Sequence, residues 1–230
     1  MPDIVQRDLE LEFVFANLWP SARLVEVGCG NGYTSQQLRN RVAFVDAFDY
    51  AEKMIEQAQT AYGETNNRFL HDSVLDPKHL QPPYDIALCV RVLMNLRDLG
   101  EQRTALLNIA RMLRPGGRLI LIEGLRDGFE ALTQFRQSIG LPPVVPASHN
   151  FHSSLVEMTT ALSAHFIIER TWHTGLYDFL TRIVFPRLVG AENATKPGEF
   201  HAKVGPIVSG FEGPEMARFA RVHGFVLTRR

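Results

Sequence analysis

The stretch LVEVGCGNGYT, residues 24–34, decides the fold. A short apolar run leads straight into three glycines at alternate positions, Gly28, Gly30 and Gly32. A glycine-rich turn between a strand and a helix lets a ligand lie against bare backbone, because no side chain stands in the way. We therefore expect a buried strand over 23–27 and a ligand-binding turn directly after it.

The spacing of these glycines separates two ligand classes. Dinucleotide sites favour Gly-x-Gly-x-x-Gly, in which the third glycine lets the helix pack closely on the strand. Here the order is Gly28-x-Gly30-x-Gly32, and Tyr33 stands where the dinucleotide pattern has its third glycine. Glu26 ahead of the loop is also unusual for a dinucleotide site. The loop therefore disfavours a nicotinamide dinucleotide.

Outward from this loop, short apolar runs alternate with helical patterns. Further strands are predicted over 43–48, 68–72, 85–90, 118–124, 165–172 and 224–230. Helices are predicted over 51–62, 99–113, 127–140 and from 155 to about 164. Two capping pairs, Asp98 with Glu101 and Ser154 with Glu157, mark helix starts. The alternation predicts an α/β fold with a doubly wound, mostly parallel sheet.

The segment between the last two predicted strands is too long for a simple hairpin. It contains a helical pattern around 176–188, a stretch rich in proline and glycine, and a short helix after Pro214. We interpret 174–223 as a helical cap inserted before the last strand of a single domain that spans 1–230.

Composition excludes several function classes. The 230 residues are 45% hydrophobic and 21% charged, with a net charge of −1 and no long basic block, which argues against nucleic-acid binding. The two cysteines, Cys29 and Cys89, favour a reducing cytoplasm over a disulfide framework. No apolar run reaches membrane-spanning length, and the first residues lack a signal-peptide pattern. The eight histidines are scattered, so we expect no metal site.

Several motifs follow one another in an informative order. They are VEVGCGNG (25–32), FVDAFDYAEKMI (44–55), HDS (71–73), YDIALCVRVLMNL (84–96) and LRPGGRLILIEG (113–124). Together they resemble the class I S-adenosylmethionine-dependent methyltransferases over about 20–125. The resemblance implies a Rossmann-like, seven-stranded sheet whose last strand is antiparallel, with S-adenosyl-L-methionine as the cofactor.

The resemblance also implies the cofactor-binding residues. They are Glu26, Gly28, Cys29, Gly30, Asn31, Gly32, Asp49, Tyr50, Met54, Asp72, Ser73 and Arg91. Asp49 lies about 20 residues beyond the loop, where a carboxylate reaches a ribose hydroxyl. With Glu52, Asp49 also fits a capping box, and Asp72 fits an ordinary turn, so structural roles stay open for both.

Acceptor residues are expected at the carboxyl ends of the strands, in elements at 125–164 and in the cap. A hydroxyl acceptor must lose its proton, which favours a general base. We name His149, Glu123 and Tyr177 as catalytic candidates, and Asn95, Asn150 and Arg182 as substrate-binding candidates. The alternative is that His149 bonds a loop carbonyl and that the aromatic residues of the cap form its own core.

The sequence therefore predicts a methyltransferase for a small-molecule acceptor, with a hydroxyl oxygen of a sugar or another metabolite favoured. The stretch RVLMNL (91–96) lacks the Asn-Pro-Pro-Tyr type motif of enzymes that methylate base amino groups. Two alternatives stay open, a nicotinamide-dependent oxidoreductase and a partner subunit that binds the cofactor without catalysis. The acceptor and the oligomeric state, a homodimer included, are also left open.

Overall fold

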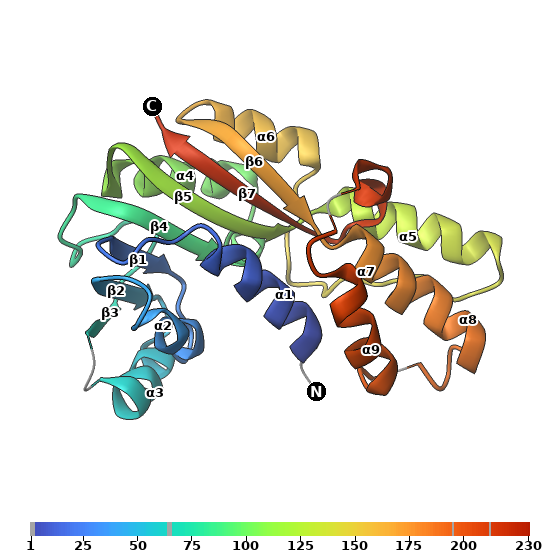
Figure 1. The fold of residues 1–230 in the computed structure, drawn as a ribbon. Helices are drawn as coiled ribbons and strands as arrows, with labels where there is room; N and C mark the ends of the chain where they lie inside the picture. Colours follow the sequence, from blue (N-terminus) through green and yellow to red (C-terminus); the bar gives the residue numbers. More distant parts are fainter. Residues whose placement is uncertain (1–2, 64–65, 195, 212) are drawn as a thin grey trace.

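Seven strands form one sheet in the order β3-β2-β1-β4-β5-β7-β6 (Figure 1). The strands are β1 (Arg23–Val27), β2 (Phe44–Asp49), β3 (Asn67–His71), β4 (Tyr84–Val90), β5 (Leu113–Gly124), β6 (Phe166–His173) and β7 (Val222–Arg229). Strands β1 to β5 are parallel, and β7 is antiparallel to both of its neighbours. The computed structural model describes residues 3–63, 66–194, 196–211 and 213–230.

The helices pack on both faces of the sheet and beyond the ends of its strands (Figure 1). They are α1 (Ile4–Phe15), α2 (Tyr33–Leu38), α3 (Glu52–Tyr62), α4 (Leu99–Met112), α5 (Arg126–Ser138), α6 (Leu155–Ser163), α7 (Gly175–Phe179), α8 (Phe185–Val189) and α9 (Glu199–Val208). Shorter turns are η1 (Leu93–Asn95), the π-helical η2 (Leu180–Val184) and η3 (Pro214–Phe219).

The core has two halves because the central strands are apolar on both faces. Val25 and Val27 of β1 pack with α4 and α6 on one face. Leu24 of the same strand packs with α1, α2 and α3 on the other face. Burial on both faces is what a parallel sheet covered by helices requires. The sheet therefore fixes the positions of its carboxyl ends rigidly.

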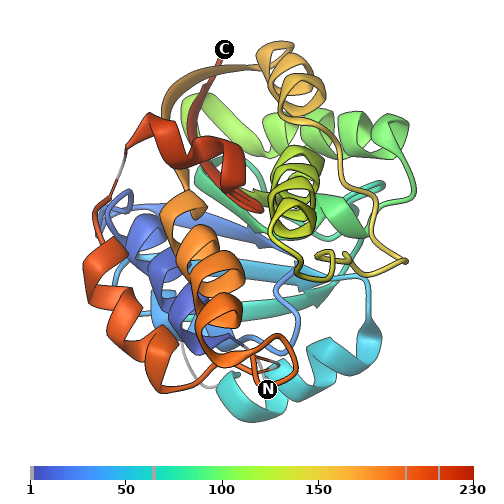
Figure 2. The same ribbon diagram turned by 90° about the vertical axis from the view of Figure 1, so that its right-hand side faces the viewer.

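The helices α7, α8 and α9 lie near the carboxyl ends of the strands, together with α1 and α5 (Figures 1 and 2). The first strand of the chain is preceded by α1, which contacts α9 of the insert. An aromatic cluster of Phe135, Phe179 and Phe219 joins α5 to the insert. The helices α5, α7, α8 and α9 thus form a second layer beyond the strand ends (Figures 1 and 2).

The predicted strands, the parallel arrangement and the antiparallel last strand are confirmed. Both capping pairs are present, since Asp98 accepts a hydrogen bond from the Glu101 amide and Ser154 from the Glu157 amide. The capping box at Asp49 is wrong, because α3 begins after Ala51, whose side chain makes no capping bond. Neither α1 nor α9 was predicted from the sequence, which suggested only a stretch rich in proline and glycine where α9 forms.

Candidate functional site

The glycine loop after β1 adopts the conformation that its sequence requires. Gly28, Gly30 and Gly32 have φ angles of +67°, +53° and +80°, a region that favours glycine. A Cβ on Gly28 would lie 2.5 Å from Val92 Cγ2, whereas a Cβ on Gly30 would meet nothing within 4 Å. The loop therefore packs at Gly28 against the segment that follows β4, whereas the space beside Gly30 is free of protein atoms in the described part of the chain.

The end of β2 is joined to this loop by Asp49. Its Oδ2 accepts a hydrogen bond from the Gly30 amide at 2.9 Å, and its Oδ1 accepts one from the Ala51 amide at 2.9 Å. Each carboxylate oxygen can still accept another hydrogen bond. Asp49 thus holds the loop and the start of α3 together while it lines a cavity.

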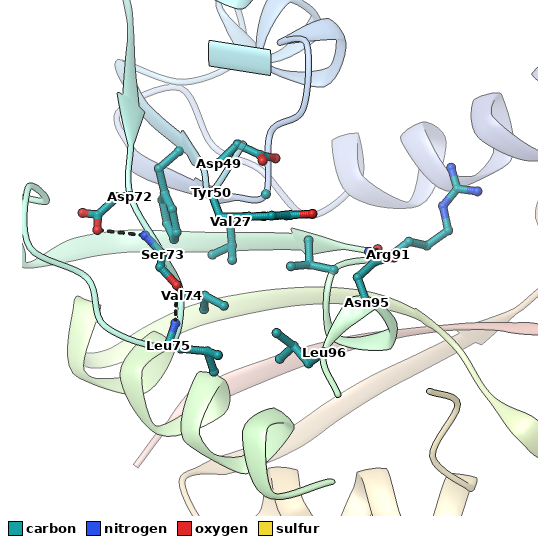
Figure 3. A pocket seen from close by; sticks show the side chains of 13 residues that line it. Val27, Asp49, Tyr50, Asp72, Ser73, Val74, Leu75, Arg91, Asn95 and Leu96 are labelled. Atoms are coloured by element: carbon teal, nitrogen blue, oxygen red, sulfur yellow. Dashed lines mark hydrogen bonds between the residues drawn. The ribbon is translucent and has the colours of Figure 1, made fainter. Parts of the chain in front are cut away.

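That cavity lies at the carboxyl ends of β1, β2, β3 and β4 and has a volume of about 340 Å³ (Figure 3). Its walls are Val27, Gly28, Phe48, Asp49, Tyr50, Asp72, Ser73, Val74, Leu75, Arg91, Val92, Asn95 and Leu96. The ring of Tyr50 is 77% exposed beside it. A mostly apolar cavity with a few polar groups is typical of small-molecule sites.

The wall at the end of β3 is held by Asp72. Its carboxylate accepts hydrogen bonds from the amides of Ser73, Lys78 and His79, all between 2.7 and 3.0 Å. Ser73 fixes the next part of the same loop, because its hydroxyl accepts a hydrogen bond from the Leu75 amide. Asp72 therefore shapes the loop through 79, which is the turn role that the sequence left open for it.

Arg91 stands at the end of β4 and faces two cavities. It has a φ of +53° without being glycine, a conformation that is uncommon for such residues. Its Nη2 pairs with Glu10 of α1 at 3.3 Å, and burial raises the pKa of the Glu10 carboxyl. Figure 3 shows its side chain reaching away from Asp72. The second cavity, of about 320 Å³, lies between α1 and the loop that follows Gly30.

The loop after β4 is fixed by Glu123 at the end of β5. Its Oε1 accepts from the Leu93 amide at 2.8 Å and its Oε2 from the Met94 amide at 3.1 Å. Burial raises the pKa of Glu123 to about 7, while these backbone bonds act in the opposite direction. The carboxylate therefore positions the segment that carries Arg91 and Asn95 into the first cavity.

The other predicted cofactor residues lie around these groups. Glu26 is buried and accepts a hydrogen bond from the Ser35 hydroxyl of α2, and burial raises its pKa to about 7. The Cys29 side chain packs in the core, and its amide bonds the Phe48 carbonyl. Asn31 lines the second cavity, and Met54 lies in α3 outside the lining of the first.

The acceptor candidates are spread over several elements. His149 is exposed in the loop 141–150, and Asn150 next to it has a buried Oδ1 with no hydrogen-bond partner among the described residues. Asn95 lines the first cavity and donates to the Arg91 carbonyl at 2.8 Å. The structure brings Asn95 to the cofactor candidates but leaves His149 on a separate loop.

Tyr177 and Arg182 of the insert both point to the first turn of α1. The Tyr177 hydroxyl donates to Asp3 at 2.6 Å, and the Arg182 guanidinium pairs with the same carboxylate at 3.3 Å. Tyr177 is 1% exposed and packs with Leu9 and Val204. Burial, reinforced by Asp3, raises the pKa of Tyr177, so its hydroxyl is a poor proton acceptor at neutral pH. These contacts match the alternative in which the aromatic residues form the core of the insert.

Sequence reasoning missed the contribution of α1, which supplies Arg7 and Glu10 to the second cavity. A signal was present, because Asp3 and Gln6 have the spacing of a capping pair and the Asp3 carboxylate caps α1. Within the described ranges no three His, Cys, Asp or Glu side chains come together as a metal site. The helices of those ranges include none long and apolar enough to span a membrane.

Comparison with known proteins adds to this geometry. A family model described as a methyltransferase domain matches residues 24–117, the part that contains the glycine loop and the ends of the four strands around the first cavity. The O-methyltransferase resE of Aspergillus sclerotiorum is 30% identical over 130 residues, which are 53% of this chain and 48% of that protein. The chain spans about half the length of the curated relatives that it matches first.

Solved structures share the fold over almost the entire chain. An S-adenosylmethionine-dependent methyltransferase from Mesorhizobium loti has a TM-score of 0.64 at 16% identity, covering 98% of this chain and 100% of that chain. Magnesium protoporphyrin IX methyltransferase from Synechocystis PCC 6803 with bound S-adenosylhomocysteine has a TM-score of 0.59 at 20% identity, covering 99% and 82%. At these identities the likeness concerns the architecture, including the elements outside 24–117.

Proposed function

We propose that the protein transfers a methyl group from S-adenosyl-L-methionine to a hydroxyl oxygen of a small molecule, and the match of residues 24–117 to a methyltransferase domain supports this proposal. The observation that carries the proposal is the open glycine loop beside the cavity at the ends of β1, β2 and β4. Asp49 and Tyr50 lie at its rim. This arrangement supports binding of S-adenosyl-L-methionine across the carboxyl ends of the strands.

The residues present fit the nucleoside part of this cofactor. The Gly30 position leaves open space above the backbone, so a ligand can approach it closely. Asp49 keeps acceptor capacity for a ribose hydroxyl beyond its two backbone bonds. The exposed ring of Tyr50 offers an aromatic surface for a base. We assign the remaining predicted cofactor contacts to the walls formed by Asp72, Ser73 and Arg91.

When bound, the cofactor supplies a methyl group already activated by the adjacent sulfonium. The protein then has to orient the acceptor oxygen, exclude water and accept one proton. We propose that His149 takes the proton, because imidazole is the side chain most often used as a general base in enzymes. Glu123 has both carboxylate oxygens on backbone amides and Tyr177 bonds Asp3, so both serve better as positioning groups.

The choice of oxygen rests on two considerations. The relative from Aspergillus sclerotiorum is named an O-methyltransferase, and RVLMNL lacks the motif of enzymes that methylate base amino groups. We propose that the elements at 125–164 and the insert at 174–223 hold the acceptor, with Asn150 and Arg182 among its contacts. Both cysteines are free and buried, which fits a reducing compartment such as the cytoplasm.

The test combines binding with transfer. We expect calorimetry to detect binding of S-adenosylmethionine and S-adenosylhomocysteine but not of NADH. We expect Asp49→Ala to weaken binding by about 1–3 kcal/mol, because it leaves the Gly30 and Ala51 amides unpaired. Glu52→Ala, at the exposed start of α3, is the control.

Incubation with cofactor carrying a labelled methyl group and with fractionated extracts of the source cell should label a small molecule at oxygen. Tight NADH binding without a response to the sulfonium cofactor would establish the oxidoreductase alternative instead. Cofactor binding with no label transferred to any fraction would favour the non-catalytic subunit.

A further inference from the structure

A band of arginines lies at the amino ends of the strands, on the edge of the sheet away from the first and second cavities. Its members are Arg23, Arg41, Arg111, Arg114, Arg118 and Arg229. Arg23 begins β1, and Arg118 of β5 pairs in register with Ile86 of β4 and with Thr228 of β7. Neighbouring strands lie about 4.8 Å apart, so a band from β2 to β7 spans roughly 20 Å. Figure 1 shows these strand ends on the side opposite the helices of the insert.

Most guanidinium groups of this arginine band have no carboxylate partner. Among the described residues, Arg114 is the one member that forms an ion pair, with Asp85 at 2.7 Å. Arg23 donates to two carbonyls of the loop before β4, at 3.3 and 3.4 Å, and Arg118 donates to a carbonyl before β1 at 3.0 Å. A carbonyl oxygen orients a guanidinium without neutralising it, and its other N–H groups remain available to an anion. The band is therefore a set of oriented positive charges.

The net charge of −1 does not reveal this band, because it is a sum over the whole chain. The arginines come from four separate segments, at 23, 41, 111–118 and 229, so the sequence contains no basic block there. The composition argues against nucleic-acid binding by the average surface, whereas the fold collects cations at one edge. A local group of cations attracts polyanions even on a protein that is neutral as a whole.

A third cavity, of about 560 Å³, adjoins the arginine band between α4 and the loop that follows β3. Arg111 belongs to the band and also lines this cavity. Pro82 lines it as well, and Arg23 bonds the carbonyls of the residues on both sides of Pro82. A ligand on the band is therefore next to the mouth of the third cavity.

The walls of the third cavity suit a flat ring with a polar edge. Leu80, Leu107 and Met112 supply apolar surface. The side-chain amide of Asn108 donates to two carbonyls of the facing loop, at 2.9 and 3.0 Å, and its oxygen can accept a hydrogen bond from a ligand. Apolar walls with a few fixed polar groups are typical of sites that take a ring such as a nucleobase.

We propose that this edge binds a single-stranded nucleic acid, with its phosphates on the arginine band and one base in the third cavity. A chain of phosphates repeats its charge at every nucleotide and suits a long band of guanidinium forks. A membrane surface would require protruding apolar side chains, and of the exposed large ones in the described ranges only Ile167 lies at this edge. The site is separate from the cavities of the proposed methyl transfer, so the two proposals are tested independently.

The first experiment measures fluorescence anisotropy of a labelled oligothymidylate of about twelve nucleotides with the full chain. We expect binding that weakens between about 50 and 200 mM salt. The slope of log K against log salt should be about −2 to −3, because each of three or four phosphate contacts on a single strand contributes about −0.7. An oligouridylate of the same length should behave alike, since the phosphates carry the charge of both.

Arg41→Gln and Arg111→Gln each remove one exposed charge of the band. Each should weaken binding about 3- to 10-fold at low salt and make the slope shallower by about 0.7. Arg97→Gln is the matched control, because Arg97 is exposed at the other end of α4 and pairs with Asp98 and Glu101. It should change binding by less than about twofold, since salt screens distant charges. Affinity for S-adenosylhomocysteine should stay the same in all three variants.

An oligomer with the same backbone but without bases tests the third cavity. We expect it to bind about 5- to 100-fold more weakly with the same salt slope, the range for one base that packs on a protein. Leu107→Asn should weaken the oligothymidylate but not the abasic oligomer, and thermal unfolding checks that this variant folds.

Three outcomes would overturn the proposal. One is equal binding of the oligothymidylate and the abasic oligomer, and another is Arg41→Gln and Arg111→Gln behaving like Arg97→Gln. The third is tighter binding to phosphatidylserine vesicles or to polyglutamate than to either oligomer, which would assign the arginine band to a membrane or to an acidic protein.

Discussion

At the scale of single residues, buried carboxylates organise the loops around the first cavity. Asp49, Asp72 and Glu123 each accept hydrogen bonds from two or three backbone amides of a neighbouring loop. Loop amides that are buried need such partners, and a fixed carboxylate supplies several at once. Each acid is therefore better described as a determinant of loop position than as a free reactive group.

His149 is the catalytic candidate that these bonds leave unengaged. If it accepts the acceptor's proton, His149→Ala should lower kcat by about 10²-fold and leave cofactor affinity unchanged. His165→Ala is a matched control at the far end of β6, where its ring contacts Phe166. The measurement is turnover across pH 6–9 with the acceptor identified by labelling. Unchanged turnover over that range would remove His149 from the mechanism.

The buried His223 of β7 makes the folding stability of the protein depend on pH. Burial, with His173 close by, lowers its pKa from 6.5 to about 4, while Asp127 and Asp178 act in the opposite direction. The unfolded chain therefore binds a proton more readily below pH 6.5, so folding stability falls as the pH drops from 6.5 through 4. This residue accounts for roughly 3 kcal/mol of that loss.

We expect His223→Gln to flatten the pH dependence of the free energy of unfolding between pH 6.5 and 4, measured by urea denaturation. His165→Gln, near the protein surface, should leave the slope as it is. An unaltered slope in the His223 variant would show that other groups control acid unfolding.

At the scale of elements, α1 connects the cavities to the insert. One face of α1 lines the second cavity, and the other carries Leu9, which packs with Tyr177 and Val208. Asp3 at its start bonds both Tyr177 and Arg182. We therefore expect a change on the cavity side of α1 to affect the insert through these contacts.

The bonds of Asp3 provide a direct test of this connection. Asp3→Asn keeps a good helix cap but removes the charge that faces Arg182. We expect a loss of about 1–3 kcal/mol in the free energy of unfolding, the range for hydrogen bonds to charged groups. Asp8→Asn, whose side chain is largely exposed, should change stability by less than about 0.5 kcal/mol. Equal effects of the two substitutions would contradict the proposed connection.

The elements that the sequence predicted well are those whose pattern is local. The strand over 23–27 and the helix opened by Asp98 are fixed by apolar spacing and by caps within a few residues. The role of Glu26 could not be predicted, because its partner Ser35 depends on how α2 packs back on β1. The pairing of Glu10 with Arg91 spans the chain from α1 to β4, and no local pattern specifies it. The glycine loop was predictable because its positive φ angles require glycine, and the three glycines lie within five residues of one another.

At the scale of the whole molecule, we assign cofactor binding and acceptor binding to different parts of the chain. Residues 24–117 contain the glycine loop and most of the walls of both cavities. The segment after β5 supplies α5, α7, α8 and α9, which gather beyond the strand ends (Figure 2). We propose that this second part, 125–164 with 174–223, determines the acceptor, whereas the first part determines the cofactor.

Hydrogen exchange tests whether the insert acts as a lid. We expect S-adenosylhomocysteine to slow backbone exchange in α1 and, through it, in α7 and α9. Backbone exchange in α6 should stay constant, because α6 packs on the face of the sheet opposite to α1. In Asp3→Asn the slowing should remain in α1 and decline in the insert. Unchanged exchange over 174–223 with the ligand bound would argue against a lid.

The direction of β7 has a practical consequence for handling the protein. Its start pairs with the cavity end of β5, at Gly124, and its end, at Thr228, pairs with Arg118 at the other end of that strand. The last residues thus emerge on the side of the sheet away from both cavities (Figure 1). A fluorophore or a tether to a sensor surface attached at Arg230 would leave the entrance clear. The same attachment beside Asp3 would disturb the bonds that join α1 to the insert.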